Sequence, residues 1–170
     1  MRKALLKEHS KEQTLKIVAY IGQDEEKVAE LMEIFFHGEY RLVQRSSWVI
    51  SHLSDKYPHL LRPYLAEMVQ NLDDPQHDAI LRNTLRYFSQ IHLPEELMGE
   101  VAEKCFTYLN SPEYPIAIRV FAMSTLYNIS LKFPELQREL ALVIEEHLPF
   151  GSAGFKSRGN KILKKINKKK

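Results

Sequence analysis

A two-helix unit that returns about every 40 residues constrains the fold of this chain more than any other feature of its sequence. The units align on an arginine within a run of helical periodicity, and the intervals between these arginines are 37, 37 and 39 residues. The arginines are Arg45, Arg82, Arg119 and Arg158. In the first three units the helix after the arginine ends at a proline, namely Pro58, Pro94 or Pro134. Self-similarity at this period, with two helices per unit, indicates an α-solenoid.

The chain opens with another helical hairpin ahead of the arginine-marked units. Ser10 and Gln13 form a capping box at the start of a helix that ends at Gly22, and Asp24 caps a second helix that ends at Gly38. Apolar residues recur three and four positions apart along the rest of the chain, and no segment alternates as a strand does. The sequence therefore predicts helices throughout.

The repeat units resemble HEAT-like repeats. That family has a first helix with a Val-Arg-like step, small or apolar residues on the next turns, a proline turn and a second apolar helix. The matching steps are Val43-Gln44-Arg45, Ile80-Leu81-Arg82 and Ala117-Ile118-Arg119, the last followed by Ala122 and Leu126. The resemblance covers about residues 10–167 and is specific for architecture, because repeat folds of this kind serve many unrelated functions.

We therefore predict an all-α fold: a right-handed α-α superhelix of the HEAT-like or armadillo type, formed by a single domain over residues 1–170. About four helical hairpins are expected, followed by a C-terminal capping helix and a basic tail. The predicted hairpins are residues 10–37, 40–73, 77–110 and 115–149, with the capping helix at 152–167 and the tail at 168–170.

Several classes of protein are excluded by the composition. The longest uncharged stretch in the middle of the chain, Val120 to Leu131, has only 12 residues, too few to span a bilayer. The N-terminus lacks the apolar run of a secretory signal peptide because Lys7 and Glu8 interrupt it. The lone Cys105 cannot form an internal disulfide, which fits a reducing compartment. We expect a cytoplasmic protein without a membrane span.

Catalytic and metal-binding patterns are absent from the sequence. The seven histidines are scattered without zinc spacing, and the single cysteine cannot build a thiolate site. The six glycines do not form a phosphate-binding loop. We expect no metal, no cofactor and no enzymatic activity.

Charge differs between the first and second helices of the predicted hairpins. The first helices are net basic, whereas the second helices are net acidic: residues 95–109 and 135–148 each carry one basic and four acidic residues. In HEAT-like solenoids the second helices line the concave face, so the resemblance implies an acidic concave face. Such a face either binds a basic or amphipathic protein segment or is simply a solvated surface. Its predicted residues are Tyr64, Glu67, Glu96, Glu100, Glu103, Glu139, Glu145 and Glu146.

The repeated arginines suggest a structural ladder. In HEAT-like families the arginine commonly bonds an acidic side chain of its own or a neighbouring repeat, and Glu39, Asp78 and Glu113 lie six or four residues before three of them. We expect Arg45, Arg82, Arg119 and Arg158 to form partly buried ion pairs. The alternative is a row of guanidinium groups that binds phosphates.

The C-terminal end is strongly basic. Residues 153–170 contain eight basic and no acidic residues, and Phe155, Gly159, Ile162, Leu163 and Ile166 form an apolar stripe. A polar-surfaced cap of the solenoid explains this pattern. Contact with RNA, DNA or anionic lipid, or with the acidic face of another copy, stays open as the alternative. The residues concerned are Lys161, Lys164, Lys165, Lys168, Lys169 and Lys170.

These observations favour a non-catalytic protein-interaction or scaffold module whose acidic concave face binds a basic or amphipathic segment of an unknown protein. The alternative is a nucleic-acid-binding relative of the HEAT-like DNA alkylation repair glycosylases. Those enzymes hold DNA on a basic concave face with Trp, Asp and Arg around the damaged base. The single Trp48 lies on a first helix, where a core or inter-repeat contact is expected.

Overall fold

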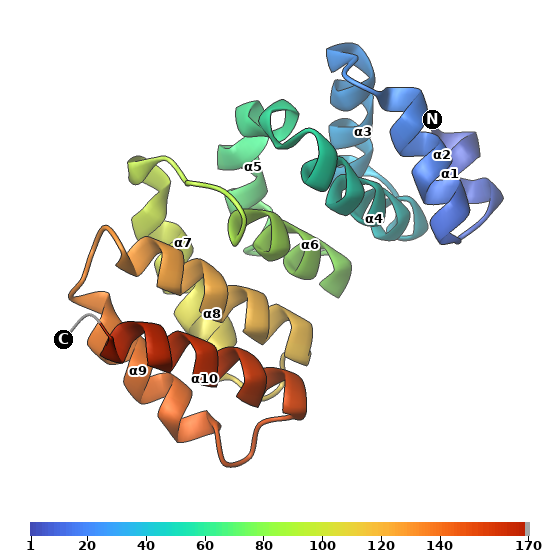
Figure 1. Cartoon of the computed structure of the whole chain (residues 1–170). Helices are drawn as coiled ribbons and strands as arrows, with labels where there is room; N and C mark the ends of the chain where they lie inside the picture. The colour runs from blue at the N-terminus through green and yellow to red at the C-terminus, as the bar shows by residue number, and fades with distance from the viewer. Residues whose placement is uncertain (169–170) are drawn as a thin grey trace. The chain divides into compact units, whose positions relative to one another are not determined.

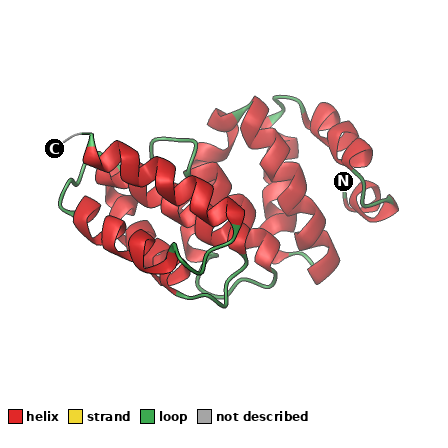
Figure 2. Ribbon diagram, turned by 60° about the horizontal axis from the view of Figure 1, so that its bottom comes forward, coloured by secondary structure: helices red, strands yellow, loops and turns green. Residues whose placement is uncertain are grey.

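The computed structural model describes residues 1–168 and confirms the predicted all-α class. Every regular element in this part of the chain is a helix (Figure 2). The chain forms two compact units, residues 1–87 and 88–170, and each is described by itself below. None of the helices described is both long and apolar enough to cross a bilayer. The predicted contacts of Lys169 and Lys170 lie outside the described residues.

The N-terminal unit is built around one long helix, α4 (Figure 1). α4 packs against α1, α2, α3 and the 3₁₀-helix η1. Its Ile50 and Leu53 and the Phe35 ring of α3 are fully buried, so these side chains form the centre of the core. The helices of this unit are α1 (Arg2–Lys7), α2 (Lys11–Ile21), α3 (Glu25–His37), α4 (Tyr40–Lys56), η1 (Pro58–Tyr64), α5 (Leu65–Gln70) and α6 (Asp78–Phe88), which ends at the boundary.

The capping residues predicted for the first hairpin are confirmed, but the Gln13 side chain makes a different contact. The Ser10 hydroxyl accepts a hydrogen bond from the Gln13 backbone N–H at 3.1 Å, and the Asp24 carboxylate accepts from two backbone N–H groups. The Gln13 side-chain amide donates to the carbonyl of Ala4 at 2.8 Å rather than closing a capping box. This bond ties α2 to α1, a short helix that precedes the predicted first hairpin.

The second helix of the next hairpin is shorter than its apolar pattern indicates. A 3₁₀-helix with Pro63 inside it occupies residues 58–64, and the α-helix that follows has only six residues. Proline has no N–H to donate and its ring clashes with the preceding turn of an α-helix. The Tyr87 hydroxyl donates to the carbonyl of Pro58 at 2.7 Å and thereby anchors this irregular segment. Burial raises the pKa of Tyr87 to about 12.

The C-terminal unit is a bundle of four helices centred on α8. α8 contacts α7, α9 and α10, and α9 also contacts α7 and α10. The α8 sequence is apolar on almost all sides, as a helix enclosed by neighbours requires. Figure 1 shows α10 running beside α8 and α9. The helices are α7 (Glu95–Asn110), α8 (Ile116–Ser130), α9 (Leu136–His147) and α10 (Ala153–Asn167).

The apolar stripe predicted for the C-terminal helix faces the core of this unit. Phe155, Gly159, Ile162 and Ile166 are buried on α10, and the Ser152 hydroxyl accepts a hydrogen bond from the Phe155 N–H as the N-cap. Gly159 permits the closest approach of α10 to α9: a Cβ atom added there would lie 2.9 Å from Cγ2 of Ile144. The position therefore accepts no larger residue without a shift of the two helices.

We expect Gly159→Val to lower the free energy of unfolding by about 1–3 kcal/mol, because the added side chain would overpack the α9–α10 contact. Urea denaturation measures the change. The matched control is Gly154→Ala on the same helix, where the nearest atoms to an added Cβ lie 3.9 Å away. This control should lose no stability, and an equal loss in both variants would contradict the close contact.

Candidate functional site

The acidic residues predicted on α7 and α9 are exposed. Helical spacing places the apolar stripe of α7 in the core, and Val101, Ala102, Cys105 and Leu109 are indeed buried. On α9 the buried residues are Leu140, Val143 and Ile144. The predicted carboxylates, all of them exposed, are those of Glu96, Glu100, Glu103, Glu139, Glu145 and Glu146.

A groove of about 340 Å³ lies between α7 and α9. We call it the acidic groove. Three carboxylate residues, Glu103, Glu135 and Glu139, belong to its lining. The remaining lining residues are Met98, Gly99, Ala102, Phe106, Ile129, Phe133 and Leu136. The groove therefore combines a mainly apolar lining with negative charge.

Three apolar residues of α7 and α9 form the wall of this groove and do not belong to the closed core. Met98, Phe106 and Leu136 are half-buried, because α7 and α9 leave a furrow between them that no helix of the unit fills. Gly99 borders open space, since a Cβ atom added there would meet nothing within 4 Å. The sequence pattern distinguishes the apolar face of a helix from its polar face, but not the core from a groove beside it.

The two carboxylates best placed to meet a ligand are not neutralised by the protein. Glu100 pairs with Lys104 at 3.4 Å, and Glu95 pairs with Lys132. Within residues 1–168, neither Glu103 nor Glu139 has a cationic partner at ion-pair distance. Both side chains are exposed, so their charge is available to a cationic ligand.

The two remaining residues predicted for the acidic face belong to the N-terminal unit. Tyr64 is the last residue of η1 and is half-buried, and the exposed Glu67 lies on α5. Glu67 approaches Nε2 of His37 at 3.6 Å. Burial raises the pKa of Tyr64, with smaller contributions from the charges of Glu25 and Glu67.

Two of the repeated arginines satisfy the ends of other helices rather than acidic side chains. Arg45 donates to the carbonyl of Leu5 at 2.6 Å, and the buried Arg119 donates to the carbonyl of Leu109 through Nε at 3.2 Å and an η nitrogen at 3.0 Å. Leu5 and Leu109 lie in the last turns of α1 and α7, where carbonyl groups lack a helical partner and cations are favourable. These two arginines therefore act as C-terminal caps.

Another of the repeated arginines, Arg82, is exposed on α6. Arg86, one turn later on α6, makes the contact with α4 instead. Arg86 donates to the carbonyl and the hydroxyl of Ser51 at 3.0 Å each and pairs with Asp55 at 2.8 Å. Arg158 makes a similar contact, because its guanidinium donates to the Ser124 hydroxyl at 2.9 Å. The sequence signal that would have found Arg86 is an arginine about 35 residues after a serine of the preceding first helix.

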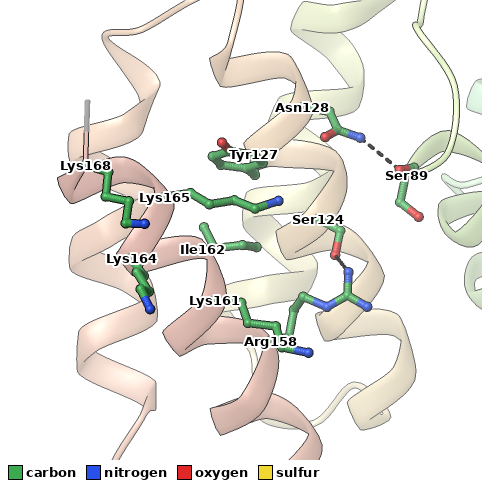
Figure 3. Close-up of a pocket in the computed structure, with 10 residues that line it drawn as sticks. All are labelled: Ser89, Ser124, Tyr127, Asn128, Arg158, Lys161, Ile162, Lys164, Lys165 and Lys168. Atoms are coloured by element: carbon green, nitrogen blue, oxygen red, sulfur yellow. Dashed lines mark hydrogen bonds between the residues drawn. The ribbon is translucent and has the colours of Figure 1, made fainter.

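Of the lysines predicted to contact an anionic partner, Lys161, Lys164 and Lys165 lie on α10 and Lys168 directly follows it. All four line a second hollow, of about 590 Å³, which α8 also lines. We call it the basic groove. Figure 3 shows the Arg158 and Lys165 side chains reaching from α10 toward α8, where Ser124 bonds Arg158 and Asn128 bonds the Ser89 carbonyl. The basic residues of its lining are Arg158, Lys161, Lys164, Lys165 and Lys168.

Trp48 and Cys105 both belong to the packing of the protein. Trp48 packs against the His9 ring, with the ring centroids 5.3 Å apart, so it ties α4 to the segment before α2. Cys105 is completely buried, and burial raises the pKa of its thiol, which keeps the thiol protonated and unreactive. Residues 1–168 contain no group of three or more His, Cys, Asp or Glu side chains that could hold a metal ion.

Comparison with known families identifies the repeat. A family model described as a HEAT repeat domain matches residues 1–166, which includes α10 up to Ile166. No curated protein and no solved structure matches the chain.

Proposed function

The chain belongs to the HEAT repeat domain family, which supplies protein-interaction and scaffold modules and is generally non-catalytic, and we propose that it binds a basic amphipathic segment of another protein in the acidic groove. The observation that carries this proposal is the composition of the groove. Apolar side chains of α7 and α9 line it, and unpaired carboxylates stand among them. A helix or extended segment with apolar residues on one side and Lys or Arg on the other complements both features.

The apolar lining supplies most of the affinity in this proposal. Met98, Phe106 and Leu136 are half-buried in the free protein, so a partner side chain placed among them removes their remaining apolar surface from water. Such burial is worth about 25 cal/mol per Å² of apolar surface, less the cost of ordering the partner segment. The partner therefore needs at least one large apolar side chain.

The carboxylates determine which partner approaches and in which orientation. Glu103 and Glu139 flank the groove on its two helices, and Glu96, Glu100, Glu145 and Glu146 add negative charge on the same two helices. Charge complementarity of this kind accelerates association and rejects acidic partners more than it adds affinity. Tyr64 and Glu67 of the N-terminal unit are proposed by themselves as a separate contact for a basic segment.

The double variant Glu103→Lys/Glu139→Lys should weaken binding of a fluorescent amphipathic Leu/Lys helical peptide at least tenfold, about 1.4 kcal/mol. It replaces the attractive charges on both sides of the groove with repulsive ones. Fluorescence anisotropy at physiological salt measures the affinity. A peptide of the same composition with the apolar and basic residues scrambled should bind the unaltered protein more weakly, because it cannot present an apolar face.

The matched control is Glu26→Lys/Glu113→Lys, which changes the net charge equally at exposed residues that do not line the groove. It should retain the affinity within about twofold, since exposed charges at a distance are screened by salt. Equal losses in both double variants, or equal affinity for the scrambled peptide, would show a general attraction to net negative charge and would refute the groove as the binding site.

A further inference from the structure

We propose that the basic groove between α8 and α10 binds the phosphate backbone of a single-stranded nucleic acid. This inference does not rest on the acidic groove, because α8 and α10 supply the ligand contacts here and α7 is not part of the lining. Four of the basic residues, Arg158, Lys161, Lys165 and Lys168, follow a spacing of three, four and three residues along α10. This spacing places them in one row on the helix surface.

The length of the row fits several consecutive phosphates. Ten residues separate Arg158 from Lys168, which corresponds to about 15 Å along a helix at 1.5 Å per residue. A stacked strand advances about 3.4 Å per phosphate, so the row spans about four phosphates. Lys164 lies beside this row and also lines the groove.

The protein leaves these charges without counter-charges. Neither α8 nor α10 contains an acidic residue, and the sequence has none after Glu146. In the part of the chain that the structure describes, Lys161, Lys164, Lys165 and Lys168 have no carboxylate at ion-pair distance. Some lysines elsewhere differ: Lys16, Lys27 and Lys132 each pair with an acidic side chain. The potential of the basic groove is therefore unscreened by the protein itself.

The lining of the groove favours a strand with bases over other anions. Tyr127 is a half-buried aromatic residue of the lining, and the Lys165 ammonium lies 5.1 Å from the centre of its ring. Rings beside a positively charged groove provide the stacking surface that single strands use. Ser124 and Asn128 add polar atoms next to it (Figure 3).

A membrane surface is less well matched to α10. Peripheral helices that bind lipid insert an apolar face between the head groups while their lysines contact the phosphates. The apolar residues of α10, including Phe155, Ile162 and Ile166, are buried in the bundle instead. The helix thus offers cations but no apolar side to insert.

Binding of a labelled twenty-nucleotide oligothymidine to the full chain tests the proposal. The triple variant Lys161→Gln/Lys165→Gln/Lys168→Gln should weaken binding at least tenfold. The plot of log K against log salt concentration should become less steep by about 2, since each phosphate contact in a single strand contributes about 0.7 to the steepness. The lysine side chains are exposed, so circular dichroism and thermal unfolding should be unchanged. Oligouridine should bind similarly if the backbone and base stacking dominate.

The control triple Lys3→Gln/Lys7→Gln/Lys11→Gln removes the same charge at exposed residues of the N-terminal unit. It should alter oligothymidine affinity less than twofold. An equal loss of affinity in the control variant, or equally tight binding of heparin of matched charge, would overturn the proposal. It would also be overturned if the protein did not bind oligothymidine but cosedimented with phosphatidylserine vesicles, and the groove triple variant abolished this cosedimentation. The last result would assign the row of cations to a lipid surface.

Discussion

Phe155→Ala is expected to lower the free energy of unfolding by about 3–5 kcal/mol, because it removes a large side chain from a closed core and leaves a cavity. Phe155 is completely buried. Its ring receives the Arg119 guanidinium 4.8 Å from its centre, and the His147 ring meets it edge-on at 6.4 Å. It is therefore the side chain that joins the start of α10 to both α8 and α9. Urea denaturation followed by circular dichroism measures the change.

Phe150 provides a matched control for this prediction. It lies five residues earlier in the chain and is 92% exposed. Phe150→Ala should change stability by less than about 0.5 kcal/mol, as substitutions at exposed positions without partners usually do. A small loss for Phe155→Ala, comparable to that of Phe150→Ala, would mean that α10 is a loosely attached end of the chain and not part of the folded core.

The features that could be predicted from the sequence are those fixed by local chemistry. A serine or aspartate before an amphipathic run caps a helix wherever it occurs, and Ser10, Asp24 and Ser152 all do so. The apolar stripe of α10 follows from spacing alone, and Phe155 and Ile166 are buried accordingly. The repeat period then relates one hairpin to the next, which is why the all-helical class follows without any structure.

The contacts of the arginines could not be predicted in the same way. Arg82 and Arg86 are four residues apart, so both lie on the same face of α6, and helical spacing cannot decide which one reaches the preceding first helix. Ser51 and Asp55 accept from Arg86, whereas Arg82 stays in solvent. The choice depends on the lateral offset of two helices, which the sequence period does not specify.

The two grooves depend on the packing of neighbouring helices in a comparable way. Phe106 belongs to the apolar stripe of α7 in the sequence, but the distance between α7 and α9 leaves it on a groove wall. The repeat period groups Arg158 with the structural arginines, yet Arg158 lines the basic groove beside Lys161. Charge and apolarity identify candidate residues, and only the packing of the helices shows which of them share a surface.

Arg119→Met is expected to lower the free energy of unfolding by about 2–4 kcal/mol. Methionine preserves much of the aliphatic packing but cannot donate, so the Leu109 carbonyl at the end of α7 loses both of its guanidinium hydrogen bonds. An unsatisfied buried acceptor costs about 1–3 kcal/mol, and the lost contact between the guanidinium and the Phe155 ring adds about 0.5–2 kcal/mol. Burial lowers the pKa of Arg119, which shows that the protein already bears a cost for this charge.

Removal of the buried Arg119 charge also has a stabilising effect. Replacing a buried charge by an apolar residue recovers its desolvation cost, and in some proteins that recovery equals or exceeds the lost interactions. Arg119 has a carbonyl and an aromatic ring as partners, so we expect the lost cap to outweigh the recovery. The exposed Arg82→Met on α6 is the control and should change stability by less than about 0.5 kcal/mol. If Arg119→Met is as stable as this control, the guanidinium does not stabilise the end of α7, and the other arginine cap, Arg45 on the Leu5 carbonyl, must be reassessed by the same substitution.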